Sequence, residues 1–140
     1  MYSYFQTIAF CLFSLPIVIK DVKVMKIPIV YSYAGLLLLL TIDVIVVKES
    51  VLMGIGGMAS LFVIFILVKK LCKNKLGEGD VHYSLFCGYY SGMLNCQISM
   101  IIACLLAISY IKIQNKSGKI PFAPFMFSGT VFGTYILNHL

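Results

Sequence analysis

Two aspartates beside lysine-rich breaks in this chain are the residues best placed to do acid–base chemistry. Asp21 follows the first apolar stretch, and Asp80 closes the tetrapeptide Gly77-Glu78-Gly79-Asp80 just before another apolar stretch. Charges are costly beside hydrocarbon, so ionisable groups in membrane segments mark functional sites. Two carboxylates that share a site cannot both ionise easily, so one keeps its proton while the other acts as a base. Such a pair can hydrolyse an amide without a metal or cofactor.

The residues around Asp80 have less specific interpretations. Gly77 and Gly79 are expected to let the backbone bend closely and to leave room for an extended peptide. Glu78 is interpreted as solvated or lysine-paired, with contact to substrate as the alternative. His82 is a candidate for tuning Asp80 or binding substrate; the alternative is no role, because residues two apart on a helix point to different faces. A Gly-x-Gly-Asp pattern alone is also typical of a plain membrane-proximal turn.

The composition assigns the chain to the integral membrane proteins. Of its 140 residues, 61% are hydrophobic and 11% are charged, whereas a soluble protein is about half apolar and about one quarter charged. This length accommodates several spans of about 20 residues but no sizeable extra domain. We therefore expect a single membrane domain over residues 1–140. Its first apolar segment is expected to remain as a span, because it lacks the features of a cleavable signal peptide.

Hydropathy predicts an all-α fold of six transmembrane helices separated by short polar breaks. The fourth helix is the weakest prediction, because Gly88 to Gly92 interrupt it with small and polar residues, although glycine is commoner in membrane helices than in soluble ones. The predicted segments are Tyr4–Ile19, Ile29–Val47, Val51–Val68, Val81–Leu94, Ile98–Ile113 and Phe122–Leu137.

The lysines predict how these helices are oriented. Ten of the eleven lie in alternate breaks, after the first, third and fifth segments, and only Lys48, beside Glu49, lies elsewhere. The positive-inside rule places lysine-rich breaks in the cytoplasm, so both termini are expected outside, in a multi-pass protein of the cytoplasmic membrane. The net charge of +6 is thus mainly a topology signal. No nucleic-acid partner is expected, because the lysines are divided among loops rather than forming one basic face.

This topology separates the aspartates into two groups. Asp21 begins the first cytoplasmic loop and Asp80 ends the second, so the two are expected to meet at the cytoplasmic boundary. Asp43 lies about 15 residues into its segment, which is roughly 20 Å along a helix. We therefore interpret Asp43 as an interfacial residue near Lys48 at the other face, and Glu49 as a similar loop residue.

Three motifs are similar to those of the prepilin peptidases. The run Asp21–Pro28, an aspartate followed by a basic stretch and Ile-Pro, resembles their first motif, and Gly77–Asp80 resembles their second, Gly-x-Gly-Asp. The run Ile120–Phe125 is similar to the Ile-Pro-Phe-x-Pro-Phe element that opens their last helix. The resemblance covers the chain from about Leu15 to Leu137.

The resemblance implies a polytopic aspartic endopeptidase, without cofactor, that removes the leader from type IV prepilins, pseudopilins or preflagellins at the cytoplasmic face. It makes Asp21 and Asp80 the catalytic pair, and Gly77 and Gly79 the residues that shape the second aspartate's loop. Pro28 of the first motif is a further candidate for shaping the site or binding substrate. The implied partners are protein substrates with a short basic leader and a hydrophobic helix, within a lipid bilayer.

Departures from the family pattern limit what the resemblance implies. Ile29 stands where asparagine commonly follows the first Ile-Pro, and His82 replaces a frequent lysine. Larger members carry a cytoplasmic domain with Cys-x-x-Cys pairs and methylate the new amino terminus. The short break that contains Lys20–Lys26 is all that lies between the first two predicted segments, which leaves no room for that domain. We therefore expect a peptidase without methyltransferase activity.

Other classes of function have weaker support. The five cysteines contain no Cys-x-x-Cys pair, so neither a zinc site nor a disulfide framework is predicted. A small transporter or channel is the main alternative, but such proteins place polar groups near the membrane midplane, whereas the acids here gather at segment ends. An inactive relative that serves as a pilus-assembly scaffold is a third possibility, and the retention of both aspartates argues against it.

Overall fold

The computed structural model describes residues 4–46, 48–73, 76–115 and 118–140, and this part of the chain is built from α-helices. The predicted all-α fold is therefore confirmed. The predicted end of the second segment at Val47 lies outside the described residues. The helices are α1 (Tyr4–Val24), α2 (Ile29–Val46), α3 (Lys48–Leu71), α4 (Glu78–Gln114) and α5 (Ala123–His139).

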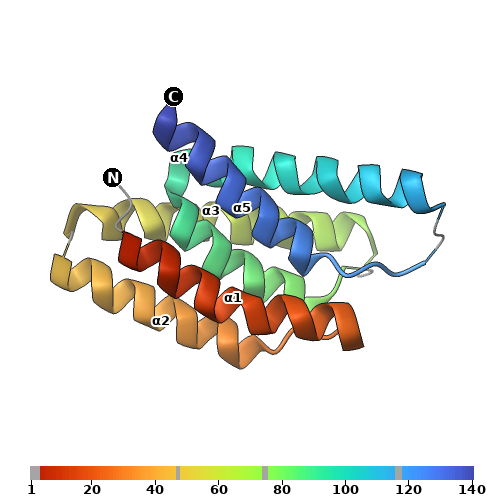
Figure 1. Ribbon diagram of the computed structural model, residues 1–140, viewed down its shortest axis with the longest axis horizontal. Helices are drawn as coiled ribbons and strands as arrows, with labels where there is room; N and C mark the ends of the chain where they lie inside the picture. Colours follow the sequence, from red (N-terminus) through yellow and green to blue (C-terminus); the bar gives the residue numbers. More distant parts are fainter. Residues whose placement is uncertain (1–3, 47, 74–75, 116–117) are drawn as a thin grey trace.

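Helix α4 changes direction at Gly92, so five helices are assigned where six were predicted. Gly92 has φ 75° and ψ 168°, a backbone conformation essentially restricted to glycine. The chain turns back there, and the limbs 78–91 and 93–114 run in nearly opposite directions (Figure 1). These limbs correspond to the fourth and fifth predicted segments. The break thus lies at Gly92 rather than at the predicted polar run 95–97.

Replacing Gly92 with alanine is expected to destabilise the fold by about 1–3 kcal/mol, because a side chain at this φ and ψ is strained. The free energy of unfolding in mixed detergent micelles measures the cost. Gly56→Ala is a matched control, since its new methyl group would meet only the flexible side chain of Met93 at 3.2–3.4 Å. Equal stability of the two variants would contradict the strain at Gly92.

Helix α3 packs against the first limb of α4 through glycines. A Cβ on Gly57 would lie 2.3 Å from the carbonyl oxygen of Gly88, and a Cβ on Gly88 would lie 2.6 Å from that of Gly57. Small residues that let backbones approach closely are typical of helix contacts in membranes. On the other side of α4, the buried ring of Phe10 on α1 stacks on Tyr90 with a centroid separation of 4.2 Å. α4 is therefore the central element of the bundle.

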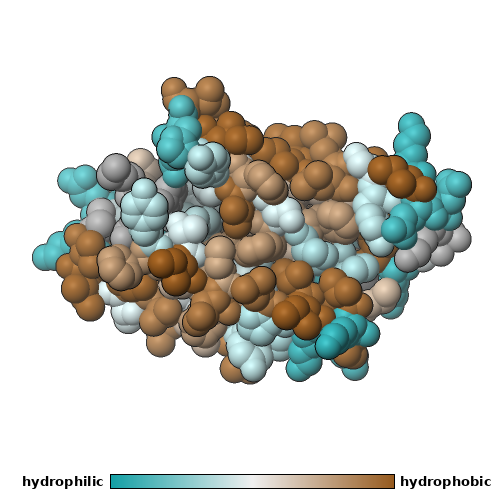
Figure 2. Space-filling model, in the orientation of Figure 1, coloured by the Kyte–Doolittle hydropathy of each residue, from teal (hydrophilic) through white to brown (hydrophobic). Residues whose placement is uncertain are grey.

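The surface of the bundle is that of a membrane protein. Helices α2, α3 and α4 are long and apolar enough to cross a membrane. Figure 2 shows apolar side chains across the middle of one face of the molecule and polar ones mainly toward its ends. An apolar band between polar ends is the distribution that a lipid bilayer requires.

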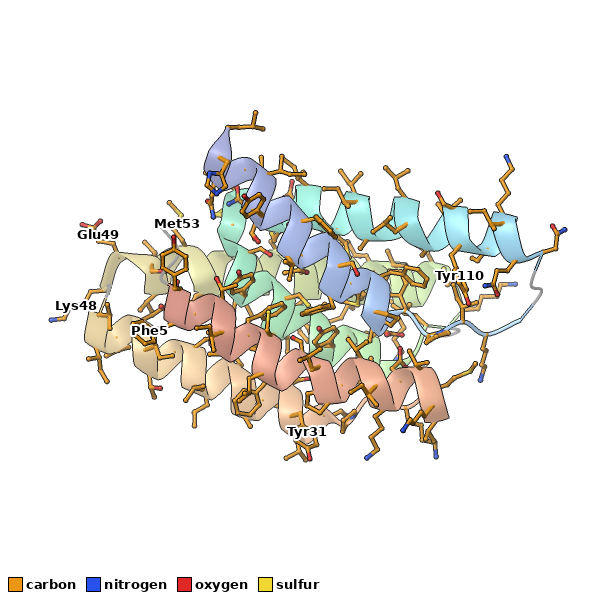
Figure 3. All side chains as sticks on the ribbon, in the orientation of Figure 1. Phe5, Tyr31, Lys48, Glu49, Met53 and Tyr110 are labelled. Carbon is orange, nitrogen blue, oxygen red and sulfur yellow. The ribbon has the colours of Figure 1, made fainter. Side chains whose placement is uncertain are left out.

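The helix ends and connections that carry the described lysines other than Lys48 lie together at one end of the bundle. In Figure 1 the connections after α1, after α3 and between α4 and α5 share this end, and both chain termini lie at the other. Lys48 and Glu49, labelled in Figure 3, lie at the terminal end. The described lysines thus follow the alternation seen in the sequence, while Lys75 and Lys116 lie outside the described residues. We call the first end the lysine-rich end.

Asp43 is buried, so its interpretation as an interfacial residue is wrong. Its residue exposure is 2%, and its carboxylate accepts hydrogen bonds from the side-chain amide of Gln6 on α1 and, at 2.9 Å, from the hydroxyl of Tyr89 on α4. Asp43 lies four residues after the buried Leu39, on the α2 face that packs inward. Its carboxylate therefore joins three helices within the bundle, away from the lysine-rich end.

Candidate active site

Asp21 lies in the last turn of α1 rather than in a loop. The helix continues to Val24 and ends where Met25 adopts φ 53° and its amide donates to the Asp21 carbonyl oxygen at 2.8 Å. A left-handed residue of this kind is a common helix terminator. The side chain is buried, and its Oδ2 accepts a hydrogen bond of 3.0 Å from the backbone N–H of Ala123 at the start of α5. Asp21 is thus held between two helices far apart in sequence.

Asp80 lies in the first turn of α4. Gly77 is the residue before that helix, with φ −62° and ψ 139° and without a side-chain hydrogen bond to the helix. A negative side chain in the first turn is favoured by the positive end of the helix dipole. Asp80 is half-buried and precedes the apolar stretch that begins at Val81. Its carboxyl group is therefore positioned at the lysine-rich end of the bundle.

The structure brings both aspartates to one cavity of about 470 Å³. This volume lies within the roughly 300–1,000 Å³ of small-molecule binding pockets. It is formed where α1 ends, where α2 begins and where α4 begins. The lining residues are Asp21, Met25, Lys26, Ile27, Ile29, Gly77, Glu78, Gly79 and Asp80.

Burial and mutual repulsion set the protonation of this pair. Burial raises the pKa of Asp80 to about 7, and the negative charge of Asp21 contributes to the rise. Burial also raises the pKa of Asp21, while backbone hydrogen bonds from Ala123 and Phe122 lower it. Near neutral pH the pair can therefore hold one proton between two carboxylates. That is the charge state in which one group can act as an acid and the other as a base.

Gly77 and Gly79 are needed for close packing rather than for an unusual backbone. Neither has a positive φ, so neither needs a left-handed backbone, and the expectation that they let the backbone bend closely and leave room for a peptide stays a prediction. A Cβ on Gly79 would lie 2.6 Å from the Cβ of Ile27, and one on Gly77 would lie 3.0 Å from Oδ2 of Asp80. The absence of side chains therefore lets Gly79 lie close to the α1–α2 connection and Gly77 lie close to the Asp80 carboxyl group.

Gly79→Ala is expected to lower substrate cleavage by about tenfold or more while the protein stays folded. The new methyl group would push Ile27 away and so shift Asp80 relative to Asp21, and a displacement of about 1 Å in a catalytic site can cost about 10²-fold. Initial rates of cleavage in detergent, normalised to folded protein, measure the effect. The control is Gly56→Ala within α3, where the new methyl group would meet the side chain of Met93 outside the cavity, and equal rates for the two variants would contradict this explanation.

Of the other predicted site residues, Glu78 lines the cavity, whereas His82 and Pro28 are not among the lining residues. Glu78 is at its rim, with a side chain that is 79% exposed, and pairs with Nζ of Lys69 at 3.3 Å, so the prediction of a lysine-paired residue is confirmed. The Nδ1 atom of His82 lies 2.8 Å from the Tyr33 hydroxyl on α2, and the cavity lining does not include His82. Pro28 lies between the lining residues Ile27 and Ile29.

Reasoning from side-chain types missed the backbone donors to Asp21. Any residue except proline presents an N–H group, so the amides of Phe122 and Ala123 have no signature in composition or charge. The Ile120–Phe125 motif was the one available signal, and it indicated the start of a helix rather than a contact with α1. The cavity-lining role of Lys26 was also missed, because its position was explained fully by topology.

Metal chemistry has no candidate residues in the described part of the chain. In the ranges that the structure covers, no group of three or more histidine, cysteine, aspartate or glutamate side chains is arranged to hold a metal ion. The five cysteines are free thiols. The titratable groups that converge at the cavity are the two aspartates, with Lys26 and Glu78 beside them.

Comparison with known proteins identifies one related family. A family model described as the type IV leader peptidase family matches residues 8–111, a segment that contains both Asp21 and Asp80. Searches of curated proteins and of solved structures gave no match. The matched segment ends before α5, the helix whose amides contact Asp21.

Proposed function

The chain belongs to the type IV leader peptidase family, and we propose that it is a membrane aspartic endopeptidase that cleaves the leader from type IV prepilin-like proteins. The observation that carries this proposal is the convergence of Asp21 and Asp80, from α1 and α4, on one cavity. The raised pKa of Asp80 supports it, since a protonated carboxyl and a neighbouring carboxylate can act as general acid and general base in amide hydrolysis without a metal.

In the proposed reaction the pair activates water and the scissile amide together. The ionised carboxylate takes a proton from a water molecule as the water oxygen bonds to the carbonyl carbon. The protonated carboxyl gives its proton to the carbonyl oxygen. The tetrahedral diol then collapses as the C–N bond breaks. The first carboxyl donates its proton to the leaving nitrogen, and the second recovers one from the diol. Both groups thus return to their starting states.

We also propose that the lysine-rich end faces the cytoplasm. The helices α1, α2 and α3, the two limbs of α4, and α5 would then make six passes through the cytoplasmic membrane, with both termini outside. The separation of Lys48 from the other described lysines (Figure 3) supports this orientation through the positive-inside rule. The cavity would open at the cytoplasmic boundary, where a basic leader joins a hydrophobic helix.

The residues around the cavity support a substrate with a basic leader, and the short α1–α2 connection supports peptidase activity alone. We propose that Glu78, exposed at the rim, meets the basic leader, and that Pro28 and His82 act indirectly by shaping the α1–α2 connection and the α2–α4 contact. The connection between α1 and α2 contains only residues 25–28. Such a short connection supports peptidase activity without the methyltransferase activity of larger relatives.

The test is cleavage of prepilin-like substrates from the same genome by the purified protein in lipid nanodiscs. Intact-mass measurement should show loss of the leader at one bond, on the amino-terminal side of the hydrophobic helix. The double variant Asp21→Asn/Asp80→Asn serves as the inactive control. Failure of the folded wild-type protein to cut any of these substrates, or equal cutting by the double variant, would reject the proposal.

A further inference from the structure

We propose that the first turn of α5 divides the work of the two aspartates: its backbone amides hold Asp21 as the ionised, water-activating base, which leaves Asp80 as the proton donor. This inference rests on the proposed peptidase function and deepens it. It assigns a positioning role to the backbone of Phe122 and Ala123. These residues lie in the Ile120–Phe125 motif, which is outside the segment 8–111 that the family model matches.

The contact between the start of α5 and Asp21 is direct and buried. The N–H of Ala123 donates to Oδ2 of Asp21 at 3.0 Å, and Ala123 is fully buried. The amide of Phe122 also interacts with this carboxylate. The first amides of a helix have no intrahelical acceptor and carry the positive end of its dipole. They therefore favour a carboxylate over a neutral acid.

Among the described residues, Asp80 has no donor comparable to the Ala123 amide. No residue that the structure describes donates a hydrogen bond to the Asp80 carboxyl group. A Cβ built on Gly77 would lie 3.0 Å from Oδ2 of Asp80. Burial and the Asp21 charge raise the pKa of Asp80. Burial raises the pKa of both carboxyls, so the difference between them is the hydrogen bond that Asp21 accepts from a backbone amide.

The start of α5 is held in place by its own packing. The ring of Phe125 lies 5.3 Å from that of Tyr110 on the second limb of α4, and Met126 is fully buried. Tyr110 is labelled in Figure 3 toward the lysine-rich end of the second limb. This packing fixes the amide donors relative to α1, so their interaction with Asp21 is part of the folded structure before substrate binds.

Other charged groups near the pair do not create this difference. Lys26 and Glu78 line the cavity that both aspartates share, and on α3 Lys69 pairs with Glu78. On the α2–α4 contact, His82 bonds Tyr33. The segment 120–126 at the start of α5 contains no titratable side chain. The feature specific to Asp21 is therefore its contact with backbone amides.

The assignment completes the proton transfers of the proposed reaction. Asp21 takes the proton of the attacking water, and Asp80 gives its proton to the carbonyl oxygen of the scissile bond. As the C–N bond breaks, Asp21 passes its proton to the leaving amine and Asp80 regains one from the diol. No other reactant is required, and the pair again carries one proton.

The test removes one N–H group without changing a side chain. Replacing Ala123 with its α-hydroxy acid analogue, by nonsense suppression in the full-length protein, turns the amide that bonds Asp21 into an ester. Loss of the donor disfavours ionised Asp21, so the acidic limb of the pH–kcat profile should move up by on the order of half to one pH unit. The alkaline limb, assigned to Asp80, should stay.

The matched control is the same replacement at Phe125. Its N–H donates to the Phe122 carbonyl oxygen at 3.1 Å in the same turn of α5, so this ester weakens the turn without removing the Asp21 contact. An unmoved acidic limb in the Ala123 ester, or equal movement in both esters, would overturn the inference. A wild-type protein that cleaves nothing would instead reject the proposed function.

Infrared spectroscopy tests the assignment without relying on activity or on the esters. In protein labelled at the aspartate carboxyl carbons, a protonated aspartate gives a C=O band that a carboxylate lacks. Between about pH 5 and 6.5, where Asp80 should be protonated, this band should be weakened by Asp80→Asn and kept in Asp21→Asn. Loss of the band in Asp21→Asn with retention in Asp80→Asn would reverse the roles and overturn the inference.

Discussion

Asp80→Asn is expected to lower the rate of leader cleavage by at least about 10²–10⁴-fold, the contribution typical of a general acid or base. Asparagine keeps the shape of aspartate, but at neutral pH it has no acidic proton to give to the scissile carbonyl. Single-turnover cleavage with saturating protein measures the loss at the chemical step. Asp21→Asn should be at least as damaging, because it removes the base.

The matched control for both variants is Asp43→Asn. Asp43 is equally an aspartate within the helical bundle, but it bonds Gln6 and Tyr89 outside the cavity. Its replacement should leave the chemical step within a few-fold of wild type. The double variant at positions 21 and 80 should be no worse than the poorer single variant, because residues that act as a unit are not additive. Cleavage that survives in either single variant would contradict the dyad.

Asp80→Asn should also make the protein more stable at neutral and alkaline pH. The folded-state pKa of Asp80, about 7, exceeds the unfolded value of about 3.9, so the folded protein binds this proton more tightly. The contribution of Asp80 to the free energy of unfolding therefore falls as pH rises between these values. Asparagine removes that cost, on the order of 1 kcal/mol after allowing for partial exposure. Thermal unfolding in detergent should show a larger gain at pH 8, above both pKa values, than at pH 5, where only part of the cost is present.

Gly57→Leu is expected to prevent close packing of α3 on α4 and to lower the free energy of unfolding by at least about 2 kcal/mol. Even its Cβ would lie 2.3 Å from the Gly88 carbonyl oxygen and 2.7 Å from the Gly92 carbonyl carbon. These are backbone atoms, so the helices themselves must separate. Denaturant titration in mixed micelles, with the fraction of monodisperse protein after purification, measures the loss.

Gly56→Leu is the control for this substitution. It lies one residue earlier on the same helix, and its nearest neighbours are side-chain atoms of Met93 at 3.2 Å and beyond, which can move. Both variants add the same apolar side chain to α3, so a general effect of leucine on the helix is removed from the comparison. Similar stabilities would show that the Gly57–Gly88 contact is not what holds these helices together.

Much of the fold followed from composition and charge. The hydrophobic fraction indicated membrane helices, and the alternation of lysines placed Asp21 and Asp80 at the same end of the bundle. The break in α4 was predicted a few residues too late, because several glycines and polar residues between 88 and 97 were equally good candidates. Only at Gly92 does the backbone adopt a conformation that an α-helix excludes.

Asp43 shows where sequence reasoning failed. Distance along a helix correctly separated it from the other two aspartates, but position along a helix does not determine which face packs inward. That face is decided by contacts with other helices, here Gln6 of α1 and Tyr89 of α4. The same limitation applies to Gly77 and Gly79, because the sequence does not show that Gly77 lies close to Asp80 and Gly79 close to Ile27.

The amino-acid sequence alone was enough to predict a membrane protein of the type IV leader peptidase family, which the family match confirms, and to identify its two candidate catalytic aspartates. These features depend on side-chain chemistry and spacing, which a sequence states directly. The three-dimensional arrangement of the helices was needed to show that the Ala123 amide at the start of α5 donates to Asp21 and that Asp80 lines the same cavity, with no such donor among the described residues. The reason is physical: backbone N–H groups are nearly identical along the chain, so their function depends on where the fold places them.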